Sequence, residues 1–229
     1  QWFLYYGAAD TFAGVAVSGQ SDFGVTAPWP TNCYYQDFDG FSVGATNSLD
    51  GATLFSTVLG GVASVQDSFQ KELQLTANGM PNVTATGGRP DIASGHAVYG
   101  FSARWDSEFY YTNVSGGGLS FNLSSITNSQ ILTLPVESGY GSGLSVDIDN
   151  DQNGTPGFFI RVDNTVVASQ AFNPDVQWGK ANSYHNVFSV DWNYANGLTL
   201  SVNGVTVFTN VPTPGFIPTP GMQFSWAAR

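Results

Sequence analysis

The sequence predicts an all-β protein, a two-sheet antiparallel sandwich, from three observations. Apolar and polar residues alternate with a period of two along several short segments, as they do in strands with one buried face. Turns rich in Gly and Asn separate these segments. Helix-period patterning is weak throughout, and residues 65–75 are the best helix candidate. A chain of 229 residues can form one such domain with a full-sized core.

The clearest elements lie in the C-terminal third. Residues 188–192 alternate Phe, Val and Trp with Ser and Asp. The runs 198–202 and 205–208 flank Asn203-Gly204, a dipeptide that suits the positive φ angles of a type I′ turn, so they predict a hairpin.

A second hairpin is predicted between 158–162 and 165–168, across Asp163-Asn164. Four prolines between 212 and 220 predict a loop between two strands.

The first 36 residues differ from the rest because they are rich in aromatic residues and glycine. We therefore divide the chain into an N-terminal extension, 1–36, and a sandwich domain, 37–229. Within the extension, 1–6 and 11–17 are β-prone and could add to a sheet as a strand. Because the chain starts at Gln1 with no initiator Met or signal peptide, we expect a processed product or a fragment.

Charge narrows the classes of partner. Seventeen acidic and six basic residues give a net charge of −11, which repels nucleic acids and anionic membranes and favours divalent cations. No run approaches the length of a membrane span. Only 10% of residues are charged, so the surface must consist largely of Ser, Thr, Asn, Gln and Gly, as is common in secreted proteins.

The one cysteine, Cys33, is expected to be a buried thiol, with an intermolecular disulfide as the alternative.

From about Phe38 onward the chain resembles bacterial concanavalin A-like (LamG-type) lectin/glucanase domains. The resemblance lies in QDFDGFSVG at 36–44, GLSVDIDNDQNGTPGFFIRVDNTVVAS at 143–169, the segment 186–216, and MQFSWAAR at 222–229, in that order. It implies a jelly-roll sandwich whose concave face or rim loops meet glycans. Such domains usually continue past the last segment with a further strand, so the resemblance also implies an open sheet edge here. Either residues 1–36 or a neighbouring molecule would fill it, and we favour the neighbouring molecule.

A calcium site is predicted where the first part of an oxygen-rich cation loop occurs. Asp149, Asp151 and Asn153 place side-chain oxygens at alternate positions, and Gly154 permits a tight turn. The Glu that would complete an EF-hand is absent. The lectin resemblance adds Asp147, because Asp147, Asp149 and Asn153 have the spacing of the legume-lectin metal loop. The alternative is a solvated Asx-rich turn.

The same residues also permit a catalytic interpretation. Asp147, Asp149 and Asp151 resemble the E-x-D-x-E strand of jelly-roll glucanases, where alternation places the carboxylates on one face. Both outer positions are Asp rather than Glu, which shortens each side chain by a methylene. We therefore predict no catalytic residues and no enzyme.

Sugar rings have apolar C–H faces that stack on aromatic side chains. Tyr140, Trp178 and Tyr184 are the predicted carbohydrate-binding residues, the first two because they lie beside glycines in loops. His96 and His185 have no spacing that indicates zinc. Sequons that could accept a glycan in a suitable host begin at Asn82, Asn113, Asn122 and Asn153.

Taken together, these patterns predict a non-catalytic, extracellular, lectin-like module for glycan binding or adhesion at the cell surface. One alternative is a structural subunit of an extracellular filament or surface assembly, joined by strand complementation through residues 1–36. Another is a jelly-roll glycoside hydrolase.

Overall fold

The computed structural model describes the strands and many of the turns of the chain. The described residues are 13–17, 32–36, 42, 44, 54–58, 64–67, 71–75, 84–89, 96–109, 118–125, 139, 142–149, 156–172 and 184–228.

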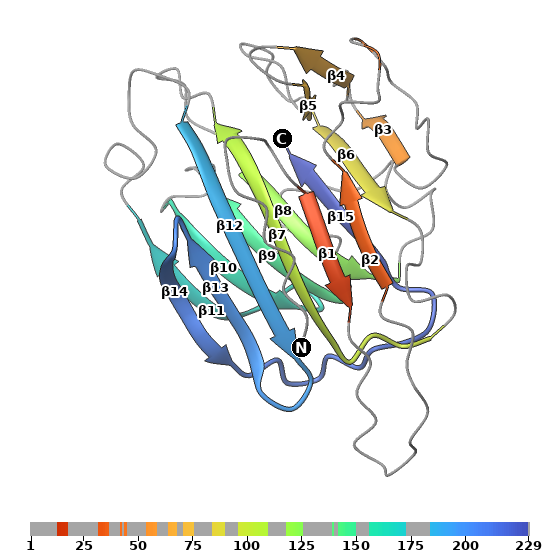
Figure 1. Ribbon diagram of the computed structural model, residues 1–229. Helices are drawn as coiled ribbons and strands as arrows, with labels where there is room; N and C mark the ends of the chain where they lie inside the picture. Colours follow the sequence, from red (N-terminus) through yellow and green to blue (C-terminus); the bar gives the residue numbers. More distant parts are fainter. Residues whose placement is uncertain are drawn as a thin grey trace.

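Two antiparallel sheets pack face to face (Figure 1). The six-stranded sheet has the order β14 (Val205–Val211), β13 (Gly197–Val202), β12 (Tyr184–Asn193), β7 (Gly100–Phe109), β1 (Ala13–Val17), β2 (Asn32–Gln36). The seven-stranded sheet has the order β11 (Thr165–Ala171), β10 (Gly157–Val162), β9 (Leu144–Asp149), β8 (Gly118–Ser124), β15 (Gln223–Ala228), β6 (Thr84–Arg89), β3 (Leu54–Val58). The predicted all-β, two-sheet sandwich is confirmed. None of the described segments forms a helix long and apolar enough to cross a membrane.

A stack of aromatic rings forms the centre of the core. Trp105 of β7 lies between Phe121 of β8, at 4.9 Å between ring centroids, and Phe188 of β12, at 5.3 Å. All three side chains are almost fully buried. The stack therefore joins the two sheets through their inner faces, and its burial stabilises the sandwich.

The local patterns in the sequence are confirmed. Asn203 and Gly204 have φ angles of 51° and 77°, as a type I′ turn requires, and they join β13 to β14. Asp163 and Asn164, at 45° and 67°, join β10 to β11 in the same way. The apolar residues of 188–192 are buried in the core while Asp191 is exposed.

The helix candidate at 65–75 is wrong, because this stretch forms a two-stranded hairpin of β4 (Ser64–Asp67) and β5 (Lys71–Gln74). Val65 and Leu73 lie opposite each other in its register. A short apolar pattern of this kind fits a turn of helix or a hairpin equally well, and cross-strand pairing decides between them.

Residues 1–36 contribute two strands to the sandwich of the same molecule. Strand β1 pairs antiparallel with β7, from Ala13 opposite Trp105 to Val17 opposite Phe101. Strand β2, which contains Cys33, continues the sheet beyond β1. Part of the predicted segment 11–17, Ala13–Val17, therefore supplies a strand within the same molecule, whereas the sequence analysis favoured a strand donated by a neighbouring molecule.

Strand β15, formed by the last segment of the resemblance, lies inside its sheet rather than at an edge. It pairs with β8 on one side and with β6 on the other (Figure 1). The sheet edge expected beside this strand is thus covered by β6, which precedes β7 in the chain.

Candidate functional site

The outer face of the seven-stranded sheet carries a group of small polar side chains. In β8, Leu119, Phe121 and Leu123 point into the core, so the residues between them point outward. The register extends this outer row to β9 and β15. We call the group the polar face; it consists of Ser120, Asn122, Ser124, Ser145, Asp147 and Ser225.

The polar face is covered, although it points away from the core. Each of its six side chains is at most 6% exposed. Part of the cover is Gly139, whose φ of +84° favours glycine. A Cβ atom at this position would lie 2.7 Å from Ser145 Oγ and 3.4 Å from Asn122 Oδ1. The chain at Gly139 therefore passes so close to the polar face that no side chain fits between them.

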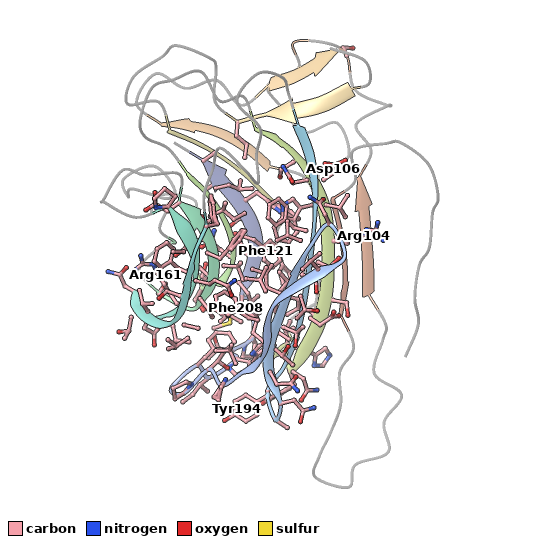
Figure 2. All side chains as sticks on the ribbon, turned by 90° about the vertical axis from the view of Figure 1, so that its left-hand side faces the viewer. Arg104, Asp106, Phe121, Arg161, Tyr194 and Phe208 are labelled. Carbon is pink, nitrogen blue, oxygen red and sulfur yellow. The ribbon has the colours of Figure 1, made fainter. Side chains whose placement is uncertain are left out.

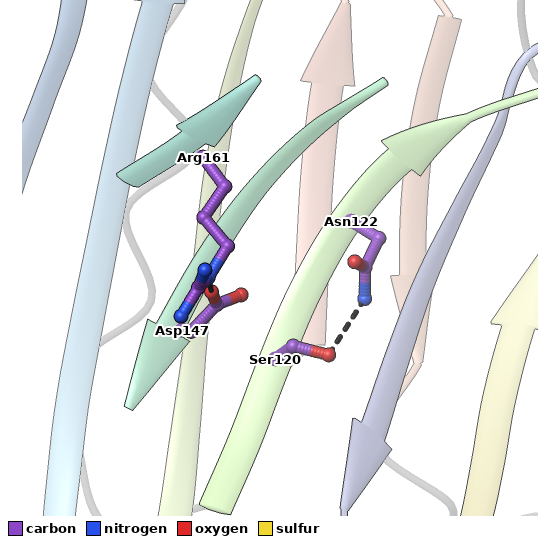
Figure 3. Close-up of polar contacts among 4 residues, drawn as sticks. All are labelled: Ser120, Asn122, Asp147 and Arg161. Carbon is purple, nitrogen blue, oxygen red and sulfur yellow. Dashed lines mark hydrogen bonds and ion pairs between the residues drawn. The ribbon is translucent and has the colours of Figure 1, made fainter. Parts of the chain in front are cut away.

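Asp147 forms an ion pair with Arg161 of the neighbouring strand β10. The Arg161 Nε atom donates to Asp147 Oδ2 at 2.6 Å (Figure 3). Burial raises the pKa of the Asp147 carboxyl from 3.8 to about 7, while the Ser145 hydroxyl and the Arg161 guanidinium lower it and the charge of Asp149 raises it further. Desolvation thus outweighs the ion pair, and this carboxyl titrates near neutral pH.

Several polar atoms of this face are buried with no hydrogen-bond partner among the described residues. Asn122 Nδ2 donates to Ser120 Oγ at 2.9 Å, but the amide oxygen is unsatisfied. In Figure 3 the Asn122 amide oxygen points toward β9, and the second carboxylate oxygen of Asp147 points toward β8. The unsatisfied atoms are Asn122 Oδ1, Ser124 Oγ, Asp147 Oδ1 and Ser225 Oγ. Each such atom costs about 1–3 kcal/mol unless a water molecule or a ligand satisfies it.

Beside the covered polar face, the outer side of β9 and β10 is partly exposed to solvent. Asp149, Phe159 and Arg161 are partly exposed and lie on the outer face with Asp147. The Arg161 guanidinium carbon lies 5.6 Å from the centroid of the Phe159 ring, and Figure 2 shows the Arg161 side chain at the flank of the sandwich. We call these three residues the rim. A ligand that binds the rim meets a carboxylate, an aromatic ring and a guanidinium together.

The structure describes two of the four predicted metal ligands, Asp147 and Asp149. Asp147 and Asp149 share one face of β9, as the alternation predicts. Asp151 and Asn153 lie outside the described residues. No group of three or more His, Cys, Asp or Glu side chains among the described residues could hold a metal ion. The guanidinium that already neutralises Asp147 argues against this residue as a calcium ligand.

The predicted carbohydrate-binding aromatics are mostly untested, because Tyr140 and Trp178 lie outside the described residues. Tyr184 begins β12, where it lies opposite Phe109.

Of the sequons, those at Asn82, Asn113 and Asn153 also lie outside the described part of the chain. Asn122 is only 1% exposed, and its amide nitrogen is bonded to Ser120. A glycan on this amide is incompatible with the folded domain.

Sequence reasoning missed most of the polar face, including Ser120, Ser124, Ser145 and Ser225, and also missed Arg161. A signal exists in GLSFNLS at 118–124, where small polar residues alternate with large apolar ones. This alternation marks the outward positions of the strand, but it does not show that the face is covered, because the surface of this chain also consists largely of Ser, Thr, Asn, Gln and Gly.

No protein-family model matches the sequence, and a comparison with curated proteins finds no match. The metal-free carbohydrate recognition domain of Emp46p matches 82% of this chain and 88% of its own at 13% identity, with a TM-score of 0.54. The exoplasmic/lumenal domain of VIP36 bound to Ca²⁺ and Man3GlcNAc matches 81% and 79% at 12% identity, with a TM-score of 0.53. A Bacillus licheniformis β-glucanase matches 82% and 83% at 14% identity, with a TM-score of 0.44. The fold is a concanavalin A-like jelly roll.

Proposed function

We propose that this chain is a non-catalytic, extracellular, lectin-like module that binds glycans at the rim. The observation that carries the proposal is the rim, where Asp149, Phe159 and Arg161 are partly exposed on one outer face and bring together a carboxylate, an aromatic ring and a guanidinium. A sugar presents an apolar C–H face and several hydroxyl groups, each able to donate and accept hydrogen bonds, so it complements this set of side chains. Two structurally similar proteins support the proposal, a carbohydrate recognition domain and a domain bound to Man3GlcNAc.

Each rim residue has a distinct part in this binding. The Phe159 ring offers an apolar surface to the C–H face of a sugar ring. The carboxylate of Asp149 accepts hydrogen bonds from sugar hydroxyl groups, and hydrogen bonds to a charged acceptor are stronger than those to a neutral one. Arg161 holds Asp147 in place through the 2.6 Å ion pair and presents its remaining N–H groups to the ligand. The site therefore binds and orients a sugar without a covalent step.

Replacing Arg161 by Gln is expected to weaken glycan binding at least tenfold, or about 1.4 kcal/mol, because it removes a charged donor and loosens Asp147. The matched control is Arg104→Gln, the same change at an exposed position of β7 in the other sheet. A glycan array should identify ligands, and titration calorimetry should give the affinities of the parent and both variants. A parent that binds no glycan, or equal affinities for all three proteins, would refute the proposal.

One observation favours glycoside hydrolysis as a second function. A carboxyl with a pKa of about 7 beside a second carboxylate, Asp149, is what general acid catalysis needs. Against this, Asp147 is buried and ion-paired. The same protein samples should therefore release no reducing sugar from β-glucans, laminarin or galactans. Release that disappears in Asp147→Asn would establish the hydrolase instead.

We also propose that Ca²⁺ binds after β9, with Asp149, Asp151 and Asn153 as ligands. Hard cations prefer such oxygen ligands, and a cation that binds only the folded state stabilises it. Millimolar Ca²⁺ is therefore expected to raise the melting temperature by a few degrees, EDTA to reverse this, and Asp149→Ala to abolish the difference. Asp191→Ala, at an exposed position of β12, is the control. Melting curves of the parent that do not change with calcium would exclude the site.

A further inference from the structure

Three large apolar side chains are exposed at one end of the sandwich. Tyr99 directly precedes β7, Tyr194 directly follows β12, and Ile217 lies in the connection from β14 to β15. Their exposed fractions are 40%, 53% and 67%. Buried rings connect them, because Trp192 contacts the ring of Tyr194 at 6.4 Å and that of Phe216 at 5.1 Å. Tyr99, Tyr194 and Ile217 are therefore connected, directly or through buried rings, at one end of the sandwich.

The two tyrosines form a corner. Their ring centroids are 5.9 Å apart and the ring planes meet at 88°. The backbone N–H of Tyr194 donates to the carbonyl of Tyr99 at 3.0 Å, which fixes the two segments side by side. Figure 2 shows Tyr194 at the lower end of the molecule, away from Arg161. A flat ligand ring can therefore stack on the face of one tyrosine ring while the edge of the ligand ring contacts the other tyrosine.

The turn that carries Tyr194 has a fixed conformation. Asn193 Oδ1 accepts a hydrogen bond from the N–H of Ala195 at 2.9 Å, and the Asn193 carbonyl accepts one from Asn196 at 3.1 Å. Gly197 closes the turn with a φ of +87°, and a Cβ atom there would lie 2.1 Å from the Val211 carbonyl oxygen. Little conformational entropy is then lost when a ligand binds the tyrosine.

The tyrosine corner lies at the opposite end of the sandwich from Asp149. Trp192 Nε1 donates to Thr213, and Thr219 of the same connection bonds Ser125, which follows β8. The corner and the end of β8 are thus at one end of the molecule. Asp149 lies opposite Gly118, at the start of β8. A ligand at the corner is therefore separated from Asp149 by the length of a strand.

The chemistry of this end favours a neutral ligand. The segments 96–100, 193–197 and 212–222 contain no Asp, Glu, Lys or Arg, in a chain with a net charge of −11. Two partly exposed rings and one isoleucine also offer far less than the roughly 800 Å² per partner of a standard protein interface. An aromatic face with polar Asn and Thr neighbours matches the C–H face and the hydroxyl groups of a pyranose.

We propose that Tyr99 and Tyr194 form a second carbohydrate subsite that stacks a neutral pyranose ring, at the end of the sandwich opposite Asp149. The assignment of a sugar as ligand rests on the proposed glycan-binding function. Two subsites at opposite ends let one domain hold two chains, or two distant parts of one polysaccharide.

The test uses the full chain carrying Arg161→Gln, which disables the rim, and neutral hexasaccharides derived from mannan, glucan and galactan as probes. Saturation-transfer NMR and titration calorimetry give contact and affinity. Tyr99→Ala and Tyr194→Ala are each expected to lower the remaining affinity at least fivefold, while Tyr194→Phe keeps the ring and stays within twofold. Val205→Ala changes an exposed apolar residue elsewhere and serves as the control.

The outcomes separate the two proposals. Unchanged affinity in both Tyr→Ala variants, with folding verified by melting curves, would overturn the subsite. Complete loss of sugar binding in Arg161→Gln alone would also overturn it, and would leave the rim as the only site. A parent that binds no hexasaccharide would overturn both proposals. Tyr194-dependent binding of choline, or Tyr194-dependent dimerisation in sedimentation, in place of sugar binding would replace the subsite with a different ligand class.

Discussion

Deletion of residues 1–36 is expected to remove most of the domain's free energy of unfolding. Strand β1 pairs with β7 along five residues, and β2 pairs with β1, so the deletion uncovers the edge of β7 and the core beside it. Bare strand edges and exposed apolar residues also promote aggregation. Small domains have only about 5–15 kcal/mol of stability, and we expect a loss of more than about 4 kcal/mol. Denaturant unfolding followed by tryptophan fluorescence measures it.

Two matched substitutions test whether this loss of stability arises from strand β1. Val15→Pro removes a backbone N–H from the middle of β1, which lies between two paired strands, and should reproduce most of the loss. Val15→Ile keeps the N–H and the β-branched side chain and should remain close to the parent. A peptide of residues 10–36 added to the deletion variant should restore the transition. A deletion variant that unfolds like the parent would show that β1 contributes nothing.

The parent is expected to lose stability as the pH rises from about 4 to about 7, and Asp147→Asn should remove the contribution of Asp147 to this loss. The pKa of Asp147 in the folded state is raised to about 7 from 3.8, so the folded state holds a proton that the unfolded state has released. Its stabilisation is complete below pH 3.8 and is lost as the pH rises through about 7. At 1.36 kcal/mol per pH unit, the change reaches roughly 4 kcal/mol.

Asparagine keeps the size of the side chain and cannot ionise, so Asp147→Asn should give a flatter profile across that range. Asp191→Asn, at an exposed position, should keep the slope of the parent. Urea unfolding at a series of pH values provides both curves. A parent whose stability rises between pH 4 and 7 would mean that the ion pair with Arg161 outweighs desolvation.

Much of the fold was predictable because its signals are local. Asn203-Gly204 and Asp163-Asn164 adopt positive φ in the structure, and few other dipeptides do so readily. The alternation in 188–192 fixes which side of β12 faces the core. Each of these features depends on neighbours within a few residues.

The remaining features depend on distant parts of the chain. Nothing near Ser120 or Asn122 in the sequence indicates that Gly139 or Ser145 lies over or beside them. The alternation of apolar and polar residues identifies the inner face of the sheet, but it does not show that the outer face is covered. The hairpin at 64–74 was misassigned for a related reason, since its strands are too short to show a period clearly.

The position of β15 governs how this protein must be synthesised. The strand fills the gap between β6 and β8, two segments that leave the ribosome long before residues 223–228. Until then β6 and β8 each lack the strand that pairs with them on one side, and the apolar side chains of β8 lack part of their packing. The seven-stranded sheet therefore assembles after translation of this segment, by slow, non-local pairing. We therefore expect a cell that makes this domain to shield those strands with a chaperone or to export the chain unfolded.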